Sequence, residues 1–169
     1  MTIPNPEHLL EQAKRLVEPR GKGPTRQVDI RRAISAAYYA VFHFVVREVA
    51  DQFTPAYLRG SPLHALAYRS IDHRQLAALC KEVRRTTLSP TVSRYLPAAG
   101  FSSALREFAG SMLELREKRN AADYDPLLKF RVADAAAVVA TAESAISGFR
   151  SADADERRTF LTLLVFPVR

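Results

Sequence analysis

Apolar residues recur three or four positions apart along most of the chain, the spacing that places them on one side of a helix. The strongest pattern runs from about Thr25 to Phe53. Its apolar stripe comprises Ile30, Ala33, Ile34, Ala37, Tyr38, Val41, Val45 and Val49. The middle of this segment is apolar on nearly all sides, which predicts a central helix contacted from two directions.

The same spacing predicts further helices, separated by breaks that contain proline and glycine. They are expected over about 6–17, over 64–85 with a break near 70–72, from a cap at Ser102 or Ser103 to Tyr124, over 127–149, and over a short stretch from 153. Residues 86–100 read as a long connection, and the run from Phe160 to Phe166 fits a helix or a strand. We therefore predict an all-α bundle of about five to six helices.

Length and composition indicate one domain spanning 1–169, with a core over about 25–150 and an apolar C-terminal extension over 151–169. The extension is expected to pack on the bundle or on a second copy of the chain. Hydrophobic residues make up 47% and charged residues 25%, as in ordinary soluble proteins. A single cysteine, Cys80, excludes an internal disulfide framework and fits a reducing compartment.

The N-terminal residues do not follow the pattern of a signal peptide. The longest stretch without a charged residue, Ala33 to Val46, is too short to span a membrane. We therefore expect a cytoplasmic protein without a membrane partner.

Several familiar chemistries find no match in the sequence. The six glycines form no phosphate-binding loop, the four histidines have no metal-ligand spacing, and a serine nucleophile elbow is missing. We accordingly expect neither a metal site nor a cofactor.

The charge balance suggests a polyanionic partner. The formal net charge is +7, and 20 of the 25 cationic residues are arginine, the side chain best suited to bidentate contact with phosphate. RNA or a nucleotide is thus a plausible partner. The alternative explanation is a GC-rich coding sequence, which enriches arginine and alanine together.

Two segments stand out as candidate functional motifs: RRAISAAYYAVFH at 31–43 and REKRNAADYD at 116–125. Together they resemble the HEPN family, in particular its small stand-alone bacterial branch with Ala-Tyr-Tyr-Ala-x-Phe-His and Arg-x-x-Ala-Asp-Tyr elements. The resemblance implies a helical bundle that usually dimerises. It also implies a metal-independent endoribonuclease, often a toxin restrained by a nucleotidyltransferase antitoxin.

In active family members, an arginine and a histidine separated by four to six residues face their counterparts in a second protomer. The resemblance therefore makes Arg119 and Tyr124 the catalytic candidates, with Arg119 holding the scissile phosphate. Tyr124 stands where an active member would carry histidine. Tyrosine titrates near 10 and is a weak general base at neutral pH, but it can donate a hydrogen bond or stack on a base.

The spacing of the second segment indicates a phosphate-binding surface without reference to the family. Arg116 and Arg119 are one helical turn apart and project from one face, while Asp123 is placed to pair with Arg119. Further candidates for phosphate or RNA binding are Asn120, Arg31 and Arg32, and accessory candidates are His43 and Tyr38.

Two structural explanations compete with this hypothesis. Arg119 and Asp123 could form an ordinary ion pair on a solvated helix face, and Tyr38, Tyr39 and Phe42 could be core aromatics. Three functions are therefore compared: a toxin-type ribonuclease, a non-catalytic module that binds RNA, a nucleotide or a nucleotidyltransferase, and a structural dimer joined through the apolar tail.

Overall fold

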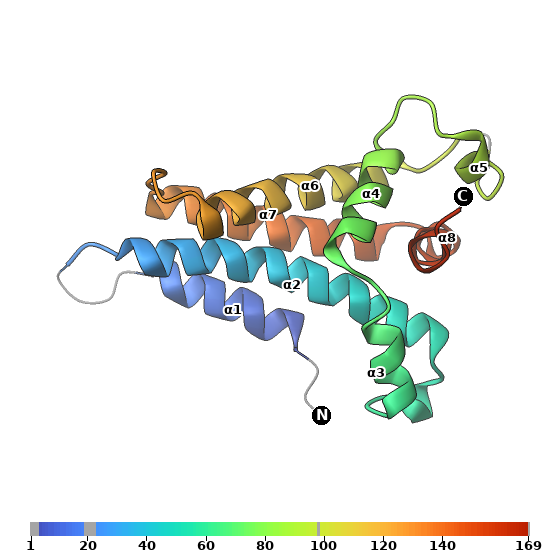
Figure 1. The fold of residues 1–169 in the computed structure, drawn as a ribbon, viewed down its shortest axis with the longest axis horizontal. Helices are drawn as coiled ribbons and strands as arrows, with labels where there is room; N and C mark the ends of the chain where they lie inside the picture. The colour runs from blue at the N-terminus through green and yellow to red at the C-terminus, as the bar shows by residue number, and fades with distance from the viewer. Residues whose placement is uncertain (1–3, 19–22, 98, 169) are drawn as a thin grey trace.

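The computed structural model describes residues 4–18, 23–97 and 99–168, which form an all-helical bundle (Figure 1). In these ranges the α-helices are α1 (Pro6–Val17), α2 (Gln27–Phe53), α3 (Pro62–Tyr68), α4 (His73–Val83), α5 (Pro90–Ser93), α6 (Ser103–Tyr124), α7 (Val132–Ser151) and α8 (Ala154–Val165). A 3₁₀ turn, η1, covers Ala56–Leu58. The all-α prediction is confirmed, but eight α-helices replace the five to six expected.

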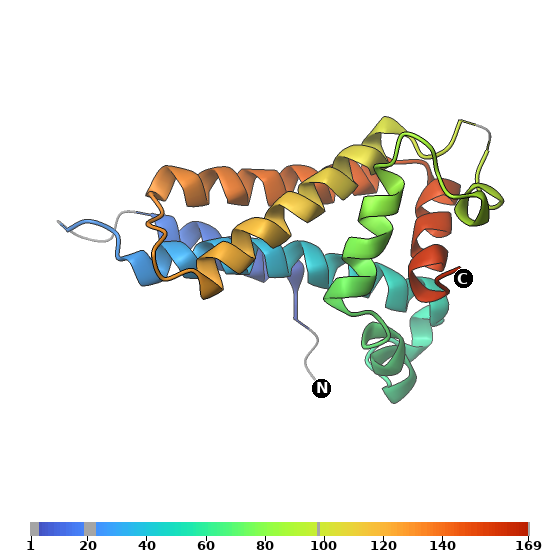
Figure 2. The same ribbon diagram turned by 45° about the horizontal axis from the view of Figure 1, so that its top comes forward.

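Helix α2 lies at the centre, as its apolar pattern predicted. It packs against α1 on one side and against α6 and α7 on another, and its C-terminal half also contacts α3 and α8 (Figures 1 and 2). Helix α1 is fastened by Glu7, whose carboxylate accepts hydrogen bonds from Arg47 on α2 and Arg150 on α7. These bonds lower the pKa of Glu7 to about 2, with Arg47 the larger cause.

Two of the extra helices come from local capping. The predicted helix over 64–85 is divided because Asp72 forms a capping box with Gln75 and starts α4 afresh at His73. Within the predicted connection over 86–100, Ser89 accepts a hydrogen bond from the Val92 N–H and begins the single turn of α5.

Helix α6 begins and ends where the sequence predicts, whereas α7 starts at Val132 rather than near Leu127. The delay has a tertiary cause. The side chain of Gln27 exchanges two hydrogen bonds with the main chain of Phe130, and this pairing keeps the segment before α7 extended. The Asp134 carboxylate then accepts a hydrogen bond from the Arg131 N–H at the start of α7.

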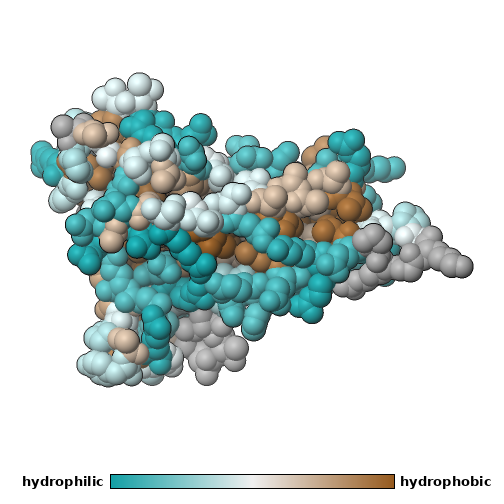
Figure 3. All heavy atoms as spheres, turned by 180° about the vertical axis from the view of Figure 1, so that it is seen from behind, coloured by the Kyte–Doolittle hydropathy of each residue, from teal (hydrophilic) through white to brown (hydrophobic). Residues whose placement is uncertain are grey.

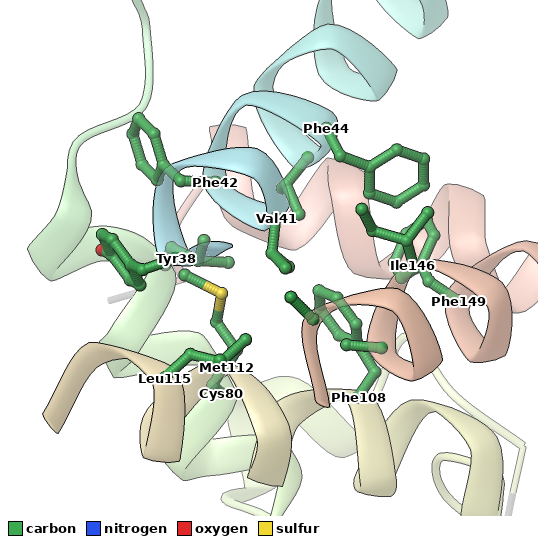
Figure 4. Close-up of a cluster of buried hydrophobic side chains, with 14 of the residues drawn as sticks. Tyr38, Val41, Phe42, Phe44, Cys80, Phe108, Met112, Leu115, Ile146 and Phe149 are labelled. Carbon is green, nitrogen blue, oxygen red and sulfur yellow. The ribbon is translucent and has the colours of Figure 1, made fainter. Parts of the chain in front are cut away.

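The core is built from apolar side chains of α2, α4, α6, α7 and α8. Figure 4 shows the part to which α2, α4, α6 and α7 contribute. Phe44, Phe108, Phe149 and Phe160 are fully buried and meet with ring centroids 4.8 to 5.8 Å apart. Cys80 lies close to Met112 and Leu115 in Figure 4, and its burial raises the pKa of the thiol to about 12.

The apolar tail packs inside the bundle. Residues 160–165 are helical, and Leu161, Leu163 and Leu164 are buried along with Phe160. At the other end of α8, Glu156 accepts hydrogen bonds from the main-chain N–H and the hydroxyl of Ser102, which precedes α6. Most of the apolar surface expected to form a dimer interface is therefore used within the chain.

Figure 3 views the molecule from the side opposite to Figure 1 and shows a band of apolar residues bordered by hydrophilic surface. Within the described ranges, α7 is the one helix whose length and composition would allow it to cross a membrane. However, its inner face, from Ala135 to Phe149, packs against α1, α2 and α6.

Candidate functional site

A polar stripe interrupts the apolar surface of α2 where it faces α6. Arg32, Ser35, Tyr39 and His43 recur at intervals of three and four residues, so they share one side of the helix. All four are at least partly exposed, between neighbours that are mostly buried. Ser35 and Tyr39 bring a hydroxyl and a phenol to the last turns of α6, where the sequence placed the candidate site, whereas the His43 imidazole contacts Tyr68 of α3.

Arg119 is the centre of this region. Its Nη1 donates to Asn120 Oδ1 at 3.0 Å, and its Nη2 donates to Tyr39 Oη at 2.5 Å. Its Nε lies 2.8 Å from Asp123 Oδ2 as an ion pair, although the N–H is not aligned for a hydrogen bond. Asp123 also accepts a hydrogen bond from the Ser35 hydroxyl. We call Arg119, its three partners Asn120, Tyr39 and Asp123, and Ser35 the Arg119 cluster.

Three tyrosine rings surround the Arg119 guanidinium. Its Cζ lies 5.8 Å from the ring centroid of Tyr38, 5.2 Å from that of Tyr39 and 5.5 Å from that of Tyr124. Tyr38 is 1% exposed and belongs to the core, whereas Tyr124 is 72% exposed. Cation–π contact therefore fixes Tyr124 beside Arg119 while much of its ring remains open to solvent.

Two tyrosine–histidine pairs border the Arg119 cluster. Tyr38 Oη lies 2.8 Å from Nδ1 of His73, the first residue of α4, and Tyr68 Oη of α3 lies 2.6 Å from Nδ1 of His43. Burial raises the pKa of both phenols to about 12, so both keep their protons. Burial is also the main cause that lowers the pKa of both histidines, and the Arg119 charge lowers that of His73 further.

Arg31 does not extend the phosphate-binding surface as expected. Its guanidinium donates to the main-chain oxygens of Ala122, Asp125 and Leu128 at 2.7, 2.8 and 2.5 Å, and it lies over the ring of Phe130. These bonds satisfy a carbonyl in the last turn of α6 and two carbonyls in the segment that follows it, and a cation at this end is also favoured by the helix dipole. We therefore assign Arg31 to support of the site.

Arg32 and Arg116 remain available to a ligand. Arg32 is exposed and Arg116 is partly exposed, and no described carboxylate forms an ion pair with either of them. Asn120 lies at the site, where its side-chain oxygen accepts a hydrogen bond from Arg119. The structure thus brings most of the predicted residues together, with Tyr38 and His43 behind them in the tyrosine–histidine pairs.

Sequence reasoning missed three contributors: Ser35, Tyr39 and His73. Ser35 and Tyr39 follow the same helical spacing as Arg32 and His43, which was a usable signal. His73 follows Asp72, the N-cap of α4, so the capping box marked its position but not its neighbours. Only the packing of α4 against α6 brings its imidazole to Tyr38 and the Arg119 charge.

The chemistry of this region suits an anion with an aromatic group. It combines guanidinium donors, a neutral imidazole and an exposed phenol ring. In the described part of the chain, no group of three His, Cys, Asp or Glu side chains is arranged to hold a metal ion. Comparison with protein-family models, with curated proteins and with solved structures finds no match for this chain.

Proposed function

We propose that this chain is a HEPN-like protein that binds single-stranded RNA at the α6 surface around Tyr124. The observation that carries the proposal is the exposed Tyr124 ring, which is backed by the Arg119 guanidinium at 5.5 Å. A base can stack on the exposed part of the ring, while neighbouring cations contact the phosphates.

The electrostatic setting supports a polyanion. The net charge of +7 attracts RNA from solution, and Arg32 and Arg116 flank the Arg119 cluster without paired carboxylates in the described ranges. Tyr39, Asp123 and Asn120 keep the Arg119 guanidinium in place before any ligand arrives. Less side-chain entropy is then lost on binding, which increases affinity.

The test is binding of a fluorescein-labelled single-stranded RNA, measured by anisotropy at several NaCl concentrations. We expect affinity that falls as salt rises, and a loss of about 1–3 kcal/mol of binding free energy for Tyr124→Ala, the range for one stacked base. Tyr57→Ala is the matched control, because Tyr57 is 84% exposed on a distant turn. Equal affinities for the two variants would remove Tyr124 from the site.

Metal-independent cleavage of the bound RNA is the second candidate function. The observation in its favour is that His43 and His73 border the Arg119 cluster, so imidazoles are present although position 124 is tyrosine. Incubation with labelled structured RNA in EDTA tests it. Cleavage that disappears with Arg119→Ala and survives in Tyr124→Phe would support an imidazole-dependent nuclease, whereas intact RNA leaves a binding module.

The homodimer and the nucleotidyltransferase partner implied by the family resemblance belong to this proposal as well. Analytical ultracentrifugation of the purified chain tests the dimer. A sedimentation coefficient that does not change with concentration and fits 18.9 kDa would contradict it.

A further inference from the structure

The contacts of Arg119 argue against its being the main phosphate ligand. Its guanidinium is already directed to Asn120, Tyr39 and Asp123, and its side chain is only 16% exposed. The carboxylate of Asp123 balances its charge at 2.8 Å. An arginine held in this way positions its neighbours but offers few donors to a ligand.

Arg116 lies one turn earlier on the same face of α6 and is differently placed. It is partly exposed, and among the described residues no carboxylate comes within ion-pair distance of it. Arg119, one turn later on this face, has its Cζ 5.8 Å from the Tyr38 ring, and the Tyr38 hydroxyl contacts His73 at the start of α4, which packs on α6. This geometry places Arg116 beside the start of α4, where burial lowers the pKa of the His73 imidazole and the Arg116 charge lowers it further. Arg116 therefore carries an uncompensated charge at the junction of α4 and α6.

His73 supplies a fixed hydrogen-bond donor at the same junction. Tyr38 Oη is buried and has no other acceptor among the described residues, so its proton is directed to His73 Nδ1. The neutral imidazole then carries its own proton on Nε2. Its ring is held against Phe42, with centroids 3.9 Å apart, and Nε2 has no described partner.

We propose that a phosphate group of the bound RNA lies between Arg116 and the Nε2–H of His73, and that Arg119 is a positioning residue for Tyr39, Asp123 and Tyr124. This inference rests on the proposed RNA-binding function and names the groups that contact the phosphate. It gives the two arginines of one helix face different roles.

Salt dependence separates these roles, because only a cation that contacts phosphate releases counterions when RNA binds. In the anisotropy experiment, Arg116→Gln should weaken binding about tenfold, as for loss of one charge-assisted hydrogen bond. It should also reduce the slope of log K against log salt by about 0.7. Arg119→Gln should weaken binding and leave the slope unchanged. The control is Arg94→Gln, an exposed arginine near α5.

Histidine variants test the second ligand. His73→Leu removes the donor and should weaken binding severalfold, whereas His73→Gln supplies an amide N–H in its place and should recover most of the affinity. His8→Leu, in an exposed position on α1, is the control. An Arg116→Gln slope equal to that of Arg94→Gln, or a His73→Leu affinity equal to that of His8→Leu, would overturn the assignment.

A direct anion titration distinguishes failure of this inference from failure of the RNA proposal. Inorganic phosphate added to the full chain should shift the NMR resonances of the His73 imidazole and not those of His8. Shifts at His73 without RNA binding would leave an anion site and refute the RNA function. RNA binding with no phosphate effect at His73 would refute the assignment made here.

Discussion

Helix α2 contributes to two aromatic clusters that differ in the groups packed against their rings. Toward its C-terminal half, Phe44 packs with Phe108, Phe149 and Phe160, and all four rings are fully buried. The one charged group against these rings in the described structure is the Arg150 guanidinium, 5.1 Å from the Phe44 centroid. Nearer the N-terminal end of α2, rings of the same helix meet imidazoles and a guanidinium close to the surface, with Tyr38 and Phe42 the buried members. The first arrangement contributes stability, whereas the second costs desolvation of polar groups unless each is paired.

In the second arrangement, formed by the Arg119 cluster and the two tyrosine–histidine pairs, almost every buried polar group is paired. Tyr38, Tyr39, Tyr68 and Asp123 all have partners. Among the described residues Arg116 has no ion-pair partner, and Tyr124 contacts Arg119 through one part of its ring while 72% of the residue is exposed. The comparison of the two aromatic clusters therefore indicates that binding depends on the side chains that the fold leaves unpaired or exposed to solvent. Each prediction below tests whether the two clusters divide stability and binding in this way.

The largest effect is expected in the cluster of buried phenylalanine rings. Phe149→Ala should lower the free energy of unfolding by about 3–5 kcal/mol, because a fully buried ring is replaced by a cavity. Urea denaturation followed by circular dichroism measures it. Phe166→Ala, at a ring that is 60% exposed, should cost far less, and equal losses would contradict the interior role of this cluster.

The next largest effect on stability is expected for replacement of Arg31, which supports the site through hydrogen bonds to main-chain oxygens at and after the end of α6. Arg31→Met keeps much of the side-chain volume but removes three hydrogen bonds to carbonyls, and about 2 kcal/mol should be lost. Hydrogen exchange should show faster opening around residues 122–131 in particular. Arg32→Met, at an exposed neighbour, is the control and should leave exchange unchanged.

A smaller effect is expected for Tyr38→Phe, which removes one hydroxyl and keeps the ring. Loss of the bond to His73 should cost about 1 kcal/mol of unfolding free energy. The pKa of His73 should rise, because the phenol no longer donates to the neutral imidazole. An NMR titration of His73 in wild type and variant measures this, and an unchanged pKa would mean that the hydroxyl does not hold the imidazole.

The smallest effect is the pH dependence of stability between pH 7.5 and 5.5. Burial lowers the pKa of His43 and His73 below the ordinary value of 6.5, so the unfolded chain binds protons that the folded chain does not. This contribution is complete above pH 6.5 and is lost as the pH falls below it. Burial raises the pKa of the Glu48 carboxyl, which acts in the opposite direction, so the measurement is made in Glu48→Gln. In that variant the melting temperature should decrease over this range, and a constant or rising value would contradict the burial of these imidazoles.

The helices could largely be predicted, because each depends on local periodicity and caps. The ends of α1 and α6 and the position of α2 follow from apolar spacing and, at the start of α6, from the cap at Ser102. The start of α7 could not, because it depends on Gln27, a residue 103 positions away from its partner Phe130.

The contacts of the candidate site within α6 could be predicted from the sequence, whereas its contacts with other helices could be predicted only in part. Spacing within one helix placed Arg116, Arg119 and Asp123 on neighbouring positions, and the Arg119–Asp123 pair is present. Spacing within α6 gave no information on α4, so the sequence analysis missed His73. It also did not distinguish the roles of Arg31 and Arg32. Adjacent arginines of similar local sequence differ because only Arg31 reaches the end of α6.

The one sulfhydryl of this chain offers a way to follow how often the bundle opens. Cys80 is fully buried on α4, the helix that carries His73, and burial raises the pKa of its thiol to about 12. A disulfide reagent reacts only with an exposed thiolate, so labelling has to await separation of α4 from its neighbours. The labelling rate thus reports the breathing of this helix, and a ligand that joins α4 to α6 should slow it.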